Sequence, residues 1–182
     1  ILASLGVKNN CEISGMVNTR NHLELILEEL SGKKIIGQNG EIVVGEGIIN
    51  KLKGFKYNIP GDISSASFLI ALAVLCKDSK LVINNLSLNN YRLGFINTLL
   101  KMGADIQVKQ IKTELGETVG TIKVCGGKEL SPCIISKSDV VDMIDEIPIL
   151  SLVCAHINNK SIIMGLEELK VKESNRFDGI IF

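Results

Sequence analysis

The chain has 182 residues, of which 46% are hydrophobic and only 4% aromatic, and its 20 Lys and Arg residues balance its 20 Asp and Glu residues. A chain without net charge is not held on nucleic acid or on an anionic membrane by its bulk charge, so the balance excludes these as main ligands. The longest nearly uncharged run, residues 63–76, is shorter than the roughly 20 residues that a transmembrane helix needs. We therefore expect a globular protein without a membrane span.

The first 59 residues are expected to form a small α/β unit. Hydrophobic periodicity predicts a helix end, a strand, an amphipathic helix and two short strands, at residues 1–7, 11–16, 23–31, 34–36 and 41–44. Gly32 suits the end of the amphipathic helix, and Gln38-Asn39-Gly40 suits the turn between the short strands. The segment 58–62, with Pro60 and Gly61, is the strongest break in the chain, so we predict two domains, 1–59 and 60–182. Asp62 and Ser64 follow this break, and we expect them to cap the next helix.

The order of elements then repeats. The second copy is predicted to hold two helices and three strands, at residues 64–76, 80–86, 95–102, 105–108 and 121–124. We expect Gly103 to end its second helix, a polar loop to join its last two strands, and a surface linker at 126–139. The third copy begins near Asp142 and contains a helix at 148–156.

The first helices of the second and third copies, 64–76 and 148–156, are apolar nearly all round, so we expect them to be buried.

Arginines recur at matching places in the three copies. Arg20, Arg92 and Arg176 each stand between a strand and an amphipathic helix, where the helix N-terminus already favours an anion. A guanidinium there can bind phosphate or carboxylate with two hydrogen bonds. Pairing of each arginine with a nearby carboxylate is the simpler interpretation of any one of them, but three in register favour anion sites.

Acidic and basic residues also gather near the ends of the buried helices. Asp142, Asp145 and Glu146 precede the helix at 148–156, and helix capping accounts for one of the three. Residues 170–176 form the densest charged stretch, which includes Lys172, Glu173 and Arg176. Such a stretch is usually a solvated face, but the repeat places this one near Asp145, so we interpret these residues as a candidate site.

Three segments together resemble one enzyme family. Residues 60–66 (PGDISSA), 143–150 (MIDEIPIL) and 167–176 (EELKVKESNR) look like successive motifs of the 5-enolpyruvylshikimate-3-phosphate synthase family, and residues 19–22 (TRNH) are similar to the motif of its glyphosate-tolerant-type bacterial branch. The resemblance implies the enolpyruvyl transferase fold, a two-lobed inverse α/β barrel in which each lobe repeats a β-α-β-α-β-β unit. The chain would hold the end of one lobe and the first part of the other, truncated in its second unit.

The resemblance also implies a reaction and roles for five residues. The family transfers the enolpyruvyl (carboxyvinyl) group of phosphoenolpyruvate to the 5-hydroxyl of shikimate 3-phosphate, in the shikimate pathway of aromatic amino acid biosynthesis. Asp145 would be the base at that hydroxyl, Lys172 would contact the same region of the ring, and Glu173 would take part in proton transfer at the methylene carbon. Arg176 would hold phosphoenolpyruvate and Arg20 would bind shikimate 3-phosphate. The full-length enzyme would be a monomer without a metal or other cofactor.

Compartment and cofactors can also be judged from the residues alone. The five cysteines are odd in number and show no C-x-x-C spacing, and His22 and His156 stand far from any Cys pair with the spacing of zinc ligands. We expect reduced thiols, a cytoplasmic protein and no metal site. The chain opens without an initiator Met in an apolar stretch, so we expect an internal piece of a longer protein.

Departures from the family pattern leave alternatives open. Several family motifs, including a Lys-containing segment and a late Arg, are absent, so we expect this chain alone to be inactive. Tyr91-Arg92-Leu93-Gly94 stands where Arg-Thr-Gly is common, and residues 140–142 stand where Ile-Pro-Arg is frequent. One alternative is the related enolpyruvyl transferase acting on UDP-N-acetylglucosamine, although no Cys here lies in a loop like its reactive one. Another is a non-catalytic remnant that binds anions.

Overall fold

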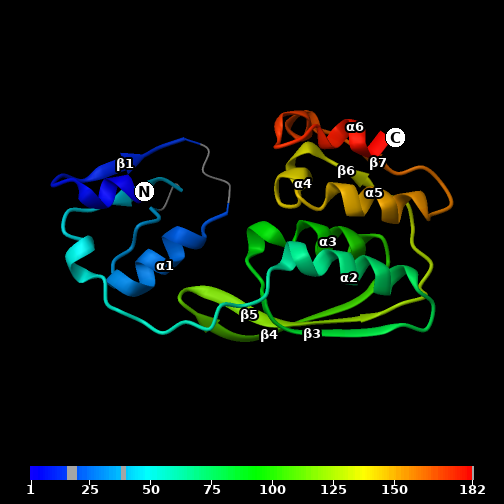
Figure 1. Cartoon of the computed structure of the whole chain (residues 1–182), viewed down its shortest axis with the longest axis horizontal. Helices are drawn as coiled ribbons and strands as arrows, with labels where there is room; N and C mark the ends of the chain where they lie inside the picture. The colour runs from blue at the N-terminus through cyan, green and yellow to red at the C-terminus, as the bar shows by residue number, and fades with distance from the viewer. Residues whose placement is uncertain (16–19, 38–39, 182) are drawn as a thin grey trace.

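The computed structural model describes residues 1–15, 20–37 and 40–181 and shows an α/β fold (Figure 1). Thr19, the last residue of the strand predicted at 11–16, and the first two residues of the turn predicted at 38–40 lie outside the described residues. Within the described residues the strands form two two-stranded sheets and one three-stranded sheet, and no helix is both long enough and apolar enough to cross a membrane.

The N-terminal part is built around one antiparallel strand pair and one helix. It comprises η1 (Ala3–Gly6), β1 (Cys11–Ile13), α1 (His22–Ser31), β2 (Ile42–Val44) and η2 (Ile49–Lys51). Helix α1 ends as predicted at Gly32, whose φ of 66° is the left-handed conformation that glycine adopts without strain. The strand predicted at 34–36 is reduced to an isolated bridge between Ile36 and Ile42.

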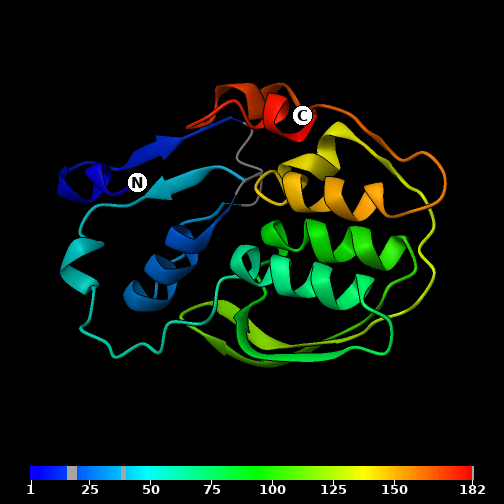
Figure 2. The same cartoon turned by 45° about the vertical axis from the view of Figure 1, so that its right-hand side comes forward.

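The middle part packs two helices on one face of a three-stranded antiparallel sheet. It comprises α2 (Ile63–Leu75), β3 (Lys80–Ser87), η3 (Asn90–Arg92), α3 (Gly94–Lys101), β4 (Asp105–Glu114) and β5 (Glu117–Cys125). The strand order is β3-β5-β4, and α2 and α3 lie side by side over this sheet in both views (Figures 1 and 2). Gly103, with φ 98°, follows α3 as the sequence predicts.

The hairpin of β4 and β5 corrects the prediction of a polar loop between two short strands. Both strands continue to Glu114 and Glu117 and meet in a two-residue turn, Leu115-Gly116, with φ of 50° and 76°. Two positive φ values match the turn that best fits the twist of a hairpin. The residues of β4 beyond Ile106 are mostly exposed, so backbone pairing, which needs no apolar pattern, extends the strands.

The C-terminal part stacks further helices on α2 and α3. It comprises β6 (Ile134–Ile135), α4 (Lys137–Val141), α5 (Ile147–Ala155), β7 (Ile162–Ile163), η4 (Glu167–Val171) and α6 (Arg176–Ile181). Strands β6 and β7 are parallel. The surface linker predicted at 126–139 is wrong over its second half, because β6 pairs with β7 and a capping box of Ser136 and Asp139 starts α4.

The burial predicted for the two apolar helices is confirmed on one face of each helix and fails on the other. Helix α2 buries residues such as Ile70 and Val74, but Phe68, Leu69 and Leu72 are 62%, 54% and 60% exposed. These three positions follow the helical period and form one stripe. Leu152 of α5 is likewise 48% exposed. Each helix therefore packs on one side only within the described chain, while the order helix, strand, helix still recurs in all three parts.

Buried apolar side chains form two separate clusters. The larger one draws on α2, α3, α5 and the three-stranded sheet, and it reaches from Ile63 to Leu169. The smaller one consists of Leu27, Ile35, Ile42, Val44 and Ile48. The predicted boundary between 59 and 60 falls between the two clusters in sequence, and it stays a prediction.

A leucine pair on α3 tests the larger cluster. Leu99 is fully buried and the next residue, Leu100, is 41% exposed. We expect Leu99→Ala to lower the free energy of unfolding by about 2–5 kcal/mol, since large-to-small changes in a packed core lose burial and leave a cavity. The matched variant Leu100→Ala should cost clearly less. Chemical denaturation measures both, and equal losses would contradict the placement of α3.

Candidate active site

Three cations converge on one carboxylate where the N-terminal and C-terminal parts of the chain meet. The guanidinium of Arg20 donates a hydrogen bond to Oδ2 of Asp145, and Nη1 of Arg176 donates to Oδ1 at 3.1 Å. Nζ of Lys172 lies 3.8 Å from the same Oδ1. The side chain of Asp145 is about a quarter exposed, so solvent reaches the cluster from one side.

Buried neighbours hold these charged residues in place. Asp145 lies in the turn before α5, between Met143 and Ile147, both of which are fully buried. Leu169 of η4 is also fully buried and anchors the segment that carries Lys172 to Arg176. The buried side chains of Met143, Ile147 and Leu169 therefore fix the positions of the short polar segments that carry the charged residues.

The cations control the ionisation of Asp145. Burial by itself would raise the pKa of this carboxyl, but the hydrogen bond and charge of Arg20, the charge of Lys172 and the hydrogen bond from Arg176 outweigh burial and lower the pKa below its usual range. The three cations face two carboxylates, those of Asp145 and Glu173, so these five residues carry one excess positive charge. Such a cluster attracts anions.

Glu173 lies at the solvent edge of the cluster. Its carboxylate accepts a hydrogen bond from Nη2 of Arg176 at 2.8 Å, and its side chain is 80% exposed. Its own backbone amide, together with Arg176, lowers the pKa of this carboxyl. Glu173 is therefore ionised near neutral pH.

A second polar group lies beside this cluster at the start of α2. Asp62 caps the helix by accepting the Ser65 amide at 2.9 Å, as the sequence predicts. Arg92 places Nη2 2.6 Å from Asp62 Oδ1 and 2.5 Å from Ser64 Oγ. One open pocket of about 400 Å³ joins the two groups; it is lined by Asp62, Ser64, Ser65, Phe68, Arg92, Asp145, Glu173 and Arg176.

The structure thus brings together all five residues singled out from the sequence, Arg20, Asp145, Lys172, Glu173 and Arg176. Asp142 does not join them; it follows α4 and lines a different pocket with Gly94 and Asn97. Sequence reasoning also missed that Arg92 binds Ser64, a hydroxyl explained there only as part of a helix cap. Ser64 lies two residues after the capping Asp62, and this position could have indicated that its hydroxyl is free to bind another group.

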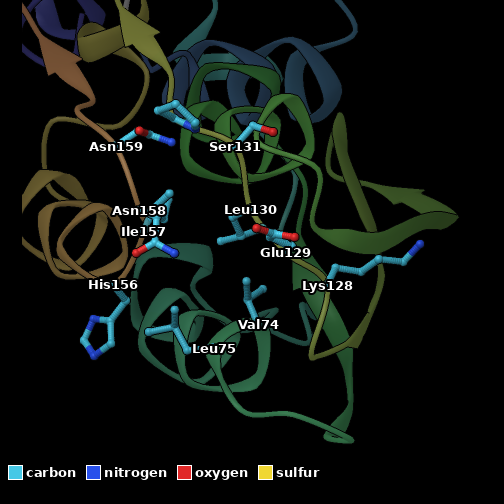
Figure 3. Close-up of a pocket in the computed structure, with 11 residues that line it drawn as sticks. Val74, Leu75, Lys128, Glu129, Leu130, Ser131, His156, Ile157, Asn158 and Asn159 are labelled. Atoms are coloured by element: carbon cyan, nitrogen blue, oxygen red, sulfur yellow. The ribbon is translucent and has the colours of Figure 1, made fainter.

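Another pocket, of about 370 Å³, lies at the opposite end of α5. It is lined by Val74, Leu75, residues 128–132 and residues 156–159 (Figure 3). The ring of His156 turns away from this hollow in Figure 3, and its Nδ1 pairs with the Leu152 carbonyl at 2.8 Å. Lys128 and Glu129 bring one charge of each sign, so this pocket lacks the excess of cations found around Asp145. In the described part of the chain, no group of three or more His, Cys, Asp or Glu residues could hold a metal ion.

Comparisons with known proteins all point to one family. The family model of EPSP synthase (3-phosphoshikimate 1-carboxyvinyltransferase) matches residues 1–181. A 3-phosphoshikimate 1-carboxyvinyltransferase from Caldicellulosiruptor saccharolyticus is 39% identical over 178 residues, 97% of this chain and 40% of that protein. One from Persephonella marina is 35% identical over 181 residues, 100% of this chain and 42% of that protein.

A solved structure agrees with these sequence relatives. EPSP synthase from Acinetobacter baumannii superposes with a TM-score of 0.89 at 29% identity, over 99% of this chain and 40% of that one. The chain therefore spans about two fifths of the length of the relatives that it matches. The structural similarity extends over nearly the whole α/β fold described above.

Proposed function

Because the chain belongs to the EPSP synthase (3-phosphoshikimate 1-carboxyvinyltransferase) family, we propose that its full-length protein transfers the enolpyruvyl group of phosphoenolpyruvate to the 5-hydroxyl of shikimate 3-phosphate. The products are 5-enolpyruvylshikimate 3-phosphate and phosphate, on the shikimate pathway of aromatic amino acid biosynthesis. The observation that supports this most is the convergence of Arg20, Lys172 and Arg176 on Asp145. Two anionic substrates need such cations, and addition of a hydroxyl needs a base among them.

The residues supply the proton transfers that the reaction requires. Asp145 takes the proton of the 5-hydroxyl, whose oxygen adds to the carbon of phosphoenolpyruvate that bears the phosphate ester. The methylene carbon of phosphoenolpyruvate gains a proton, with Glu173 taking part. Loss of a proton from the resulting methyl group and departure of phosphate then complete the transfer, with the same groups working in reverse. Lys172 lies beside Asp145 and stabilises negative charge there.

Binding of the substrates also prepares the two carboxylates. Arg20 binds shikimate 3-phosphate and Arg176 binds phosphoenolpyruvate, and each arginine must then share or leave its contact with Asp145. Asp145 thereby loses part of what lowers its pKa and becomes a stronger base. Glu173 likewise regains affinity for a proton when phosphoenolpyruvate engages Arg176.

The compartment and assembly belong to the same proposal. All five cysteines are free, which suits the reducing cytoplasm, and we place the full-length protein there as a monomer. With the domain boundary at 59/60, we propose that the substrates bind between the two lobes. Arg20 belongs to the first lobe and contacts Asp145 of the second.

Arg176→Lys in the full-length protein tests the assignment of the phosphoenolpyruvate site. A lysine keeps the charge but loses the forked pair of hydrogen bonds. We expect the KM for phosphoenolpyruvate to rise about tenfold or more, since a hydrogen bond to a charged group contributes about 1.5–3 kcal/mol. The KM for shikimate 3-phosphate should change much less. Steady-state phosphate release measures both values.

Lys170→Arg is the matched control, because Lys170 belongs to the same charged stretch but lies over the ring of Phe177 rather than on Asp145. It should leave both KM values near those of the wild type. An unchanged KM for phosphoenolpyruvate in Arg176→Lys would contradict the role given to Arg176.

A further inference from the structure

A buried glutamate stands directly behind the proposed base. Glu146 follows Asp145 in sequence and occupies the N-cap position of α5, but its side chain makes no capping hydrogen bond. The residue is only 4% exposed, and its Oε1 accepts no hydrogen bond from any described residue. A buried carboxyl left partly unpaired is costly, and helix capping does not account for it.

The carboxyl of Glu146 is linked to the polar group at the start of α2. The Ser64 hydroxyl accepts a hydrogen bond from Arg92 at 2.5 Å, and the Ser64 side chain lies near enough to the carboxyl of Glu146 to lower its pKa. Ser64 lies in the first turn of α2 and Glu146 at the start of α5, two helices that pack against each other. Arg92, Ser64 and Glu146 therefore form one polar group between the two helix starts.

Charged groups face Glu146 from each element around it. Burial is the main cause that raises the pKa of Glu146, and the neighbouring charge of Asp145 raises it further. Ser64, Arg92 and Arg20 oppose the rise, and Asp62 balances part of the charge of Arg92. Glu146 thus holds its proton up to a higher pH than Asp145 does, and its ionisation changes the field at Asp145.

We propose that Glu146 is a positioning residue for the enolpyruvyl transfer, tying the start of α5 to Ser64 and Arg92 so that Asp145 is fixed at the site. Its carboxylate charge also acts on Asp145, which is a stronger base next to a negative charge than next to a neutral one. This role rests on the proposed function, since it assigns Asp145 as the base. Glu146 itself touches neither substrate nor reacting atoms.

Two substitutions separate the positioning contact of Glu146 with Ser64 from the effect of its charge on Asp145. In the full-length protein, Glu146→Ala removes both, and we expect kcat to fall about 10²-fold, the typical cost of displacing a reacting group by about 1 Å. Glu146→Gln keeps an oxygen that accepts the Ser64 hydroxyl but cannot ionise. Its kcat should fall by less than about tenfold, because a modest change in the basicity of a general base changes the rate only in part.

The dependence of kcat on pH gives a signature that a merely structural role would not produce. Wild-type kcat should decline as pH falls through the raised pKa of Glu146, whereas Glu146→Gln should lack this step. The two profiles should therefore converge at acid pH. Glu24→Gln is the control, because Glu24 is similarly buried, 5% exposed, but lies on α1; it should keep the wild-type profile.

Three results would overturn the inference while leaving the function intact. These are a wild-type kcat in Glu146→Ala, an unchanged pH profile in Glu146→Gln, and a loss in Glu146→Gln as large as that in Glu146→Ala. The pH profile of Glu146→Gln decides the matter even if Glu146→Ala does not fold. A wild-type protein without any turnover would overturn the proposed function, and this inference with it.

Discussion

Replacing Asp145 by Asn in the full-length protein is expected to lower kcat about 10²-fold or more, because a positioned general base typically contributes 10²–10⁴-fold. Asparagine has nearly the same shape and keeps one oxygen, which can accept a hydrogen bond from Arg20 or from Arg176, since the two bind different oxygens of Asp145. Arg20 itself stays in place to bind shikimate 3-phosphate. Affinity for shikimate 3-phosphate should therefore change little. The pKa of Asp145 lies below its usual range, so the wild-type carboxylate is ionised near neutral pH. Asparagine does not ionise at any pH, so raising the pH should not rescue the variant.

Asp142→Asn is the matched control for this experiment. Asp142 is three residues away and also partly buried, but it belongs to another pocket and takes no part in the cluster of cations. Coupled phosphate release gives kcat, and titration calorimetry gives the affinity for shikimate 3-phosphate. A turnover of Asp145→Asn close to that of the wild type would contradict the assignment of the base, and equal losses in both variants would point to a general disturbance of the segment.

Local signals in the sequence predicted the ends of helices well. Gly32 and Gly103 both adopt positive φ after α1 and α3, and Asp62 caps α2. Each of these features depends on a few neighbouring residues and on backbone geometry that only certain residue types favour. The order of elements was likewise carried by short-range periodicity.

Features that depend on distant partners could not be predicted in the same way. The hairpin of β4 and β5 is held by backbone pairing between polar strands, which leaves no hydrophobic alternation to detect. Arg20 and Asp145 are 125 residues apart, and no local pattern shows that they meet. The family resemblance named the two as site residues, but only the fold shows that Arg20, Lys172 and Arg176 share one carboxylate.

The exposed stripe of α2 follows from the same limitation. Periodicity reports that a helix is apolar all round, but it does not report what packs on each side. Phe68, Leu69 and Leu72 are exposed here although their apolar character is that of a buried helix. We predicted burial from the apolar residue types alone. Within the described chain, other elements cover one face of α2 and leave Phe68, Leu69 and Leu72 exposed.

Residues 1–182 alone are expected to bind shikimate 3-phosphate weakly or not at all and to show no turnover with phosphoenolpyruvate. The chain covers about two fifths of the relatives that it matches, and its candidate site is an open pocket in which Glu173 is 80% exposed. Arg20 and Arg176 are the cations assigned to the two substrates, and both are already paired with Asp145. An arriving anion must displace these pairs with few further contacts to compensate.

The open pocket is the reason that we expect residues 1–182 to lose turnover and not only substrate affinity. Catalysis by positioning falls about 10²-fold for a displacement of roughly 1 Å, and an open pocket lets both reactants move by more than that. Phosphate release should be followed for residues 1–182 and for the full-length protein at equal concentration, with the full-length Asp145→Asn variant as the baseline. Turnover by residues 1–182 above that baseline would show that the cluster around Asp145 suffices for the chemistry, and would remove the argument that the rest of the protein must hold phosphoenolpyruvate in place.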